Sequence, residues 1–286
     1  MKHFTLNIQG RIHTISTPWV MGIINVTTDS FHSDSRVSGT NAAQERASEM
    51  LKNGARIIDL GAYSSRPGAP AVELSEEWNR LEQAIPVVLK AIAAHNKAHP
   101  KREAFLSIDT CTAEIARRSI AAGAHIINDI SAGDADPEMM ATVAELQCPY
   151  ILMHMQGNPQ NMQDNPNYTN VVEEVFGYLS AKVAALAKLG VHNSIIDVGF
   201  GFGKTVEHNY QLLAALETFN QLERPVLTGV SRKSMIYKPL QTTPEHALNG
   251  TTALHAWALK SGSKILRVHD VKEAVECINL YQLLEG

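Results

Sequence analysis

The hydrophobic and polar positions of this chain repeat one short pattern four times. Each repeat has two isoleucines followed by Asn or Asp: Ile23-Ile24-Asn25, Ile57-Ile58-Asp59, Ile126-Ile127-Asn128 and Ile195-Ile196-Asp197. Short β-branched runs are typical of buried parallel strands, and a polar last residue marks where the strand leaves the core. Three of the repeats follow a glycine that can end a helix: Gly54, Gly123 and Gly190. The pattern therefore predicts a series of helix and strand units.

The same patterning extends along most of the chain. It indicates strands over 19–24, 56–60, 105–109, 125–129, 149–153, 194–198, 225–230 and 264–268. Helical composition or apolar spacing near 3.6 predicts helices over 42–53, 75–95, 112–122, 137–146, 168–189, 207–215, 244–260 and 271–284. These units predict an α/β fold, a TIM (β/α)8 barrel. Two short strands around Gln9-Gly10, over 4–8 and 11–15, predict an N-terminal β-hairpin. We expect a single domain over residues 1–286, with residues 1–17 forming a hairpin that caps the barrel.

Composition and charge narrow the class of partner. The chain has 286 residues, 44% of them hydrophobic, and its net charge is −4 without a run of Lys or Arg. Nucleic-acid and anionic-membrane binding are therefore disfavoured, and small-molecule chemistry is expected. Three widely separated cysteines, Cys111, Cys148 and Cys277, argue against a disulfide framework or a zinc site. With no apolar secretory segment near Met1, these features predict a cytoplasmic protein.

Polar residues at the predicted strand ends form the candidate site. In such a barrel the carboxyl ends of all strands meet on one face, where active sites lie. A lone polar residue there is more often a helix cap, but several in register favour a site. Asp109, Asn128 and Asp197 together offer the acceptors and donors that suit an aminopyrimidine edge, such as that of a pterin or purine. No ligand can be argued for Asp59, which we expect to anchor the following loop.

Cations stand among the same strand ends and predict an anion. Arg267 and His269 lie two apart on one strand and hence share a face, while Arg66 and Lys233 follow other strands. A packed, hydrogen-bonded role is the alternative for His269. A diphosphate fits this group of cations, and Asn25 could give an oxygen to a Mg²⁺ that keeps most of its waters.

A glycine-rich segment over 199–205 imitates nucleotide-binding motifs but fits none. It lacks the first glycine of a P-loop, because Val198 stands there, and its glycine spacing differs from the dinucleotide fingerprint. The glycines would allow a sharp turn beneath a ligand, with Phe200 or Phe202 packing on its ring. Met153 either pads a flat ligand or belongs to the core.

The amino-acid sequences of several segments resemble those of the dihydropteroate synthase family. The segments run in the family's order from about residue 19 to the C-terminus: Met21 to Phe31, Asp59 to Ala69, Ser107 to Thr110, Ile127 to Ser131, Leu152 to Met155, Asp197 to Lys204, Gly229 to Ser234 and Arg267 to Asp270. The resemblance implies a dimeric TIM barrel and a transferase of folate biosynthesis. Such an enzyme joins 4-aminobenzoate to (7,8-dihydropterin-6-yl)methyl diphosphate with Mg²⁺ and is a sulfonamide target.

The resemblance also implies a division of roles among site residues. Asp109, Asn128, Asp197 and Lys233 would hold the pterin, in a pocket lined by Met153, Phe202 and Gly229. The diphosphate would be held by Asn25, Arg267 and His269, and by Val268, which lies between Arg267 and His269. Asn25 would also bind the metal. The aminobenzoate site would include Phe31, Ser65, Arg66, Pro67 and Ser231. Replacing Arg267 is then expected mainly to weaken diphosphate binding.

The sequence departs from the family at a few positions and leaves alternatives open. Ala62-Tyr63 stands where Gly-Glu is frequent, and the loop after Phe31 leaves Asp34 as one candidate for the family's carboxylate. The competing readings are a pterin-binding methyltransferase domain, a catalytically inactive pterin-binding paralogue, and an aldolase that uses Lys233 as a Schiff base.

Overall fold

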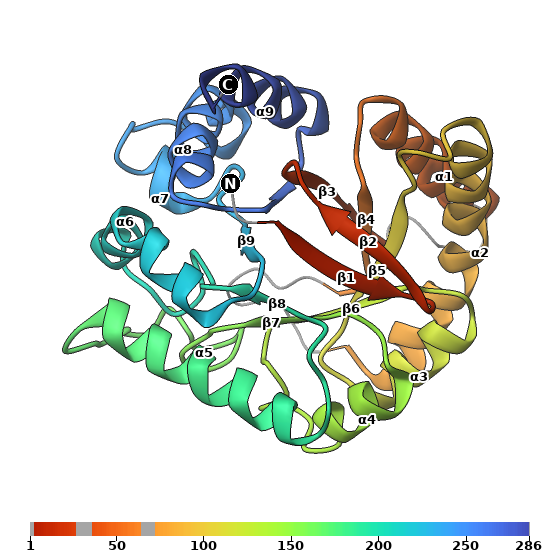
Figure 1. The fold of residues 1–286 in the computed structure, drawn as a ribbon, viewed down its shortest axis with the longest axis horizontal. Coiled ribbons are helices and arrows are strands. Elements are labelled where there is room, and N and C mark those ends of the chain that lie inside the picture. The colour runs from red at the N-terminus through yellow and green to blue at the C-terminus, as the bar shows by residue number, and fades with distance from the viewer. Residues whose placement is uncertain (1–2, 27–35, 64–71, 286) are drawn as a thin grey trace.

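Eight parallel strands close into a barrel in a computed structural model that describes residues 3–26, 36–63 and 72–285 (Figure 1). The strands are β3 (Trp19–Asn25), β4 (Ile57–Gly61), β5 (Phe105–Asp109), β6 (Ile126–Asp129), β7 (Tyr150–Met153), β8 (Ser194–Asp197), β9 (Val226–Thr228) and β10 (Ile265–Val268). They pair in sequence order, and β10 pairs with both β9 and β3 to complete the closure. The predicted TIM barrel is confirmed.

Helices surround the barrel as an outer ring (Figure 1). They are α1 (Arg36–Lys52), α2 (Leu74–Ala98), α3 (Ala113–Ala121), α4 (Met139–Leu146), α5 (Val171–Lys188), α6 (Val206–Ala214), α7 (Ser234–Tyr237), α8 (Leu248–Lys260) and α9 (Val271–Glu285), with 3-10 turns at Leu216–Leu222 and Pro244–His246. The sequence did not predict α7, which is too short to show a helical period. The helix predicted over 244–260 is divided into a 3-10 turn and α8.

Glycines end three of these helices as the sequence predicted. Gly54, Gly123 and Gly190 follow α1, α3 and α5 with φ angles of +104°, +104° and +78°. This left-handed region is unfavourable for residues with a Cβ, so glycine stops each helix at low cost and turns the chain toward the next strand.

Side chains of the strands alternate between the barrel interior and the layer under the helices. Ile57 packs inside with Trp19 and Phe105, whose rings stack with centroids 5.9 Å apart, whereas Ile58 packs in the outer layer. The repeated motif is thus explained: its first isoleucine and its polar residue face inward, and its middle isoleucine faces the helices.

The hairpin of β1 (Phe4–Ile8) and β2 (Arg11–Ile15) lies across the opening that faces the viewer in Figure 1. Its buried Leu6, Ile8 and Ile15 join the cluster formed by the first inward residues of the strands. The N-terminal end of the barrel is therefore covered, and the polar strand ends lie at the opposite end. Within the described residues, none of the helices is both long and apolar enough to cross a membrane.

Candidate active site

Arg267 lies at the centre of the polar residues inside the barrel. Its Nη2 atom is 2.7 Å from Asp59 Oδ2 and 2.9 Å from Asp109 Oδ2, and its Nε donates to Asp59 Oδ2 at 2.7 Å. Only 15% of its side chain is exposed. One guanidinium thus joins two carboxylates from β4 and β5, which lets both stay near one another in the interior.

Asp59 belongs to this cluster, a set of contacts that the sequence did not predict. It is fully buried, and its Oδ2 also accepts a hydrogen bond from Asn128 Nδ2 at 3.1 Å. Its Oδ1 has no hydrogen-bond partner among the described residues. The missed signal was the alternation along β4, because Asp59 lies two residues after the inward-facing Ile57.

Burial dominates the electrostatics of Asp109. Desolvation raises the pKa of Asp109 to about 7, because the opposing effect of Arg267 is smaller and Asp59 adds a like charge. The Tyr63 hydroxyl donates to Asp109 Oδ1 at 3.3 Å, so both oxygens of this carboxylate have a donor before any ligand binds.

For the dihydropterin that the resemblance implies, we expect the affinity to rise with pH through about 7. The carboxylate of Asp109 accepts N–H groups, whereas its protonated form gives up acceptor capacity, so binding gains as the proton leaves. Calorimetry of a dihydropterin below and above this pH measures the change. Asp109→Asn, which cannot titrate, should bind weakly at every pH, and an unaltered pH profile in this variant would contradict the assignment.

Asp197 and Lys233 lie beside this cluster, and each affects the pKa of the other. Burial raises the pKa of Asp197, with Lys233 opposing, and lowers the pKa of Lys233 to about 8, with Asp197 opposing. Lys233 Nζ donates to the Phe200 carbonyl at 2.5 Å and lies 4.6 Å from the centroid of the Phe202 ring. The amine is therefore engaged at the wall of the site, over an aromatic face that a flat ligand could share.

The glycine-rich turn at 199–203 is held by side chains that bind its carbonyl groups. Lys204 Nζ donates to the carbonyls of Gly199 and Phe202, both at 3.0 Å, and to His154 Nδ1 at 2.9 Å. Lys204 is 3% exposed, and burial lowers its pKa to about 7. Gly199 has φ +72°, and a Cβ there would lie 1.9 Å from the His154 carbonyl, so this position requires glycine.

The sequence left Phe200 and Phe202 as alternatives for packing on a ligand ring, and the structure of this turn distinguishes them. Phe200 is fully buried in the outer hydrophobic layer. Phe202 instead packs with Met153, Ile130 and Met162 in a small cluster of its own. Because Phe202 also lies beneath Lys233, the structure brings Phe202 and Met153 to the barrel mouth and leaves Phe200 in the core.

For the pterin substrate that the resemblance implies, we expect Lys204→Met to lower kcat/KM on the order of 10-fold, mainly by raising KM. The variant leaves the Gly199 and Phe202 carbonyls without their buried donor, so the turn that carries Phe202 loses its fixed position. Steady-state kinetics measure the effect. Lys188→Met, at an exposed position near the end of α5, is the control, and equal kinetics in both variants would contradict a positioning role.

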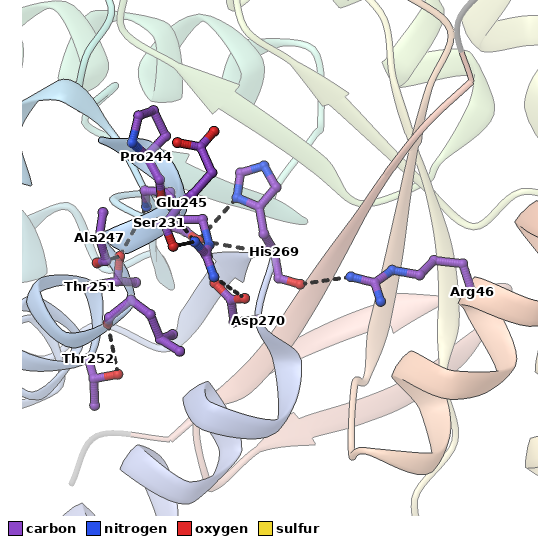
Figure 2. Close-up of polar contacts among 11 residues, drawn as sticks. Arg46, Ser231, Pro244, Glu245, Ala247, Thr251, Thr252, His269 and Asp270 are labelled. Atoms are coloured by element: carbon purple, nitrogen blue, oxygen red, sulfur yellow. Dashed lines mark hydrogen bonds and ion pairs between the residues drawn. The ribbon is translucent and has the colours of Figure 1, made fainter. Parts of the chain in front are cut away.

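A second group of polar contacts surrounds His269, just after β10 (Figure 2). Its Nδ1 lies 3.1 Å from Ser231 Oγ, and burial together with Arg267 lowers the pKa of His269 to about 4. Asn25 ends β3 with an exposed side chain, and its Oδ1 would lie 3.2 Å from a Cβ at Gly61. Arg267, His269 and Asn25 thus come from neighbouring strands at the open end, where an anion would find donors.

Other predicted site residues divide into three groups. Gly229 borders the charged cluster, since a Cβ there would lie 3.7 Å from Lys233 Nζ and 3.9 Å from Asp197 Oδ2. The Val268 side chain is fully buried in the outer layer, so the structure does not bring it to the barrel mouth. Four predicted residues lie outside the described residues: Phe31, Ser65, Arg66 and Pro67.

A cavity of about 410 Å³ opens to one side of the mouth. It is lined by Tyr63, Glu77, Cys111, Ile130 and Met155, among others, and includes none of the charged residues around Arg267. We therefore place the candidate site at the strand ends, where ionisable groups with shifted pKa values converge. Among the described residues no three His, Cys, Asp or Glu side chains are grouped to hold a metal ion.

Comparison with known proteins gives one consistent result. A family model described as "Pterin binding enzyme" matches residues 21–269. Dihydropteroate synthase of Escherichia coli strain K12 is 42% identical over 276 residues, which span 96% of this chain and 94% of that protein.

Solved structures of dihydropteroate synthases share the fold over almost the whole chain. The Xanthomonas albilineans enzyme with 4-aminobenzoic acid has a TM-score of 0.86 at 38% identity, covering 99% of this chain and 98% of that one. The Yersinia pestis enzyme in a sulfonamide drug complex has a TM-score of 0.86 at 37% identity, covering 99% of each chain. The Xanthomonas albilineans enzyme with 7,8-dihydropteroate has a TM-score of 0.84 at 35% identity, again covering 99% of each chain.

Proposed function

The chain belongs to the dihydropteroate synthase family of pterin-binding enzymes, and from this premise we propose how its residues divide the work of the reaction. The enzyme is a transferase that joins (7,8-dihydropterin-6-yl)methyl diphosphate to 4-aminobenzoate, giving 7,8-dihydropteroate and diphosphate. The observation that carries our assignment is the convergence of Asp59, Asp109 and Asn128 on Arg267, with Asp197 and Lys233 beside them.

Asp109, Asn128 and Asp197 bind the pterin in this proposal. Two carboxylates and an amide present acceptors and a donor to the amino and ring N–H groups of an aminopyrimidine. The buried environment strengthens each hydrogen bond because water is excluded. Phe202, with Lys233 above its ring, forms one wall, and Met153 packs beside it.

Arg267 and His269 bind the diphosphate, and their role grows as the reaction proceeds. The bond between the methylene carbon and the diphosphate oxygen breaks, the aminobenzoate nitrogen bonds to that carbon, and the amine releases one proton. Negative charge increases on the departing oxygen, so a fixed guanidinium and an N–H donor stabilise the transition state more than the ground state. An aromatic amine is already nucleophilic, so the chain needs no strong base of its own.

The donor set fits a Mg²⁺ that arrives with the diphosphate. Asn25 offers one exposed neutral oxygen near the proposed diphosphate-binding residues. A single protein ligand of this kind is typical of magnesium held mostly by substrate phosphates and water. When bound, the ion would supply charge neutralisation to the leaving group. We therefore expect no measurable Mg²⁺ binding in calorimetry without diphosphate, and tighter diphosphate binding when Mg²⁺ is added. Tight Mg²⁺ binding to the protein alone would contradict this arrangement.

We also propose a homodimer in the cytoplasm. Apolar side chains on the outer face of the C-terminal helices support the dimer: Leu280, Leu283 and Leu284 share one face of α9 and are 67%, 80% and 85% exposed, and Trp257 of α8 is 57% exposed. The three free cysteines support a reducing compartment. Analytical ultracentrifugation measures the oligomeric state, and a monomer at micromolar concentration would contradict the dimer.

An assay with both substrates and Mg²⁺ tests the proposed function. Purified enzyme should release dihydropteroate and diphosphate in equal amounts, and sulfonamides should compete with 4-aminobenzoate. Binding of both substrates without product would instead support a binding protein. Asp109→Asn serves as the control, because it keeps the shape of the site but removes a pterin acceptor.

A further inference from the structure

His269 is held from opposite sides by the loop after β9 and by helix α1. Its backbone N–H donates to Ser231 Oγ at 3.2 Å, and its carbonyl accepts from Arg46 Nη2 of α1 at 3.2 Å. Figure 2 shows Ser231 and Arg46 on either side of His269. The ring contacts Ser231 Oγ through Nδ1 at 3.1 Å, while Nε2 makes no hydrogen bond to the described part of the chain. The ring orientation is therefore set by one side chain.

The hydrogen-bond capacity of Ser231 decides which ring nitrogen carries the proton. Ser231 is 3% exposed, so its hydroxyl needs a partner inside the protein. The oxygen already accepts the His269 N–H; if it also accepted an Nδ1–H, its single hydrogen would have no acceptor among the described residues. Within the described residues the acceptor in reach of that hydrogen is His269 Nδ1. An accepting Nδ1 leaves the proton of a neutral imidazole on Nε2.

Neighbouring contacts hold Ser231 in this place. Arg232 has a left-handed backbone with φ +54°, and its guanidinium binds Asp270 through two hydrogen bonds of 2.7 and 2.9 Å. It also donates to the carbonyls of Pro244 and Glu245. The residues directly after Ser231 and His269 are thus joined by a bidentate ion pair, which fixes the distance between the two loops.

We propose that Ser231 is a positioning residue for the transfer reaction: it holds His269 as the Nε2–H tautomer, so that a neutral imidazole presents a hydrogen-bond donor to the diphosphate. The inference rests on the proposed role of His269 in the function above. The opposite tautomer would turn a lone pair toward the anion and repel it. Burial, which lowers the pKa of His269 to about 4, supports the neutral form.

The tautomer can be measured directly in the ligand-free protein. Histidine labelled with ¹⁵N gives distinct long-range spectra for the two neutral tautomers, and the spectrum of His269→Gln identifies the His269 signals among those of the 12 histidines. We expect Nε2–H in the wild type and a mixture in Ser231→Ala. Ser231→Thr, which keeps the hydroxyl, should restore Nε2–H, and Ser234→Ala is the matched control. A wild-type Nδ1–H form, or an unchanged tautomer in Ser231→Ala, would overturn the inference.

Affinity for inorganic pyrophosphate separates this inference from the proposed function. Glutamine can place a donor near the position of Nε2, whereas asparagine reaches only the position of Nδ1. His269→Gln should therefore stay within about 3-fold of the wild type, while His269→Asn should lose about 10-fold, as expected for a hydrogen bond to a charged group. Ser231→Ala keeps part of the population in the Nε2–H form, so it should lose only about 2-fold for an even mixture. If His269→Asn binds pyrophosphate as the wild type does, His269 has no diphosphate role, and the role assigned to it above fails independently of the tautomer.

Discussion

Arg267→Met should abolish the transfer reaction and lower the free energy of unfolding by about 3–5 kcal/mol. The variant removes the single cation that lies between two buried carboxylates, those of Asp59 and Asp109. Without it, burial and mutual repulsion both favour protonation of a carboxylate that must accept pterin N–H groups. Pterin affinity should therefore fall along with pyrophosphate affinity. Denaturant unfolding and calorimetry with each ligand measure these effects.

This expected result differs from the prediction made from sequence alone, that replacing Arg267 mainly weakens diphosphate binding. Asp59→Asn added to Arg267→Met removes one of the two unpaired charges, so it should restore part of the lost stability without restoring activity. Loss of pyrophosphate binding with unchanged pterin affinity in Arg267→Met would show that the contact between Arg267 and Asp109 does not matter for the pterin.

The fold was predictable because its signals are local. A run such as Ile126-Ile127-Asn128 fixes the strand by its β-branched composition, and Gly123 ends the preceding helix at low conformational cost. Eight such units leave few topologies, since parallel strands joined by helices pair in order. By contrast, α7 has only four residues, and no period can be read from so short a segment.

The identity of the site residues was partly predictable, but their partners were not. Alternation along each strand places Asp109, Asn128 and Asp197 on the inner face. The resemblance of the surrounding segments to the family indicates a pterin. That Arg267 reaches across the barrel to β4 and β5 depends on strand stagger and side-chain length, which no local pattern encodes. The sequence also did not predict that Lys204 donates to the carbonyls of the glycine-rich turn, because no local pattern encodes these contacts.

Asp59→Asn is the most direct test of the architecture around Arg267, and we expect kcat/KM to fall on the order of 10-fold to 100-fold. The amide is nearly isosteric, so the packing of β4 should survive. The neutral amide leaves Asp109 as the remaining carboxylate partner of Arg267. The guanidinium is therefore drawn toward Asp109, the proposed pterin acceptor, and away from the diphosphate. Both pterin and pyrophosphate affinity should therefore decrease, as measured by calorimetry.

The alternative role for Asp59, that of anchoring the loop after β4, predicts a different pattern of loss. A loosened loop would raise KM for 4-aminobenzoate and leave pyrophosphate affinity unchanged, because the contacts of Arg267 would be intact. Ser107→Ala is the matched control: Ser107 pairs with Asp59 across β4 and β5, is fully buried, and its hydroxyl has no partner among the described residues. An Asp59→Asn variant that matched Ser107→Ala in pyrophosphate affinity but failed with 4-aminobenzoate would restore the loop anchor. We expect the reverse, because the carboxylate that ends the repeated motif in β4 is bound to Arg267 inside the barrel.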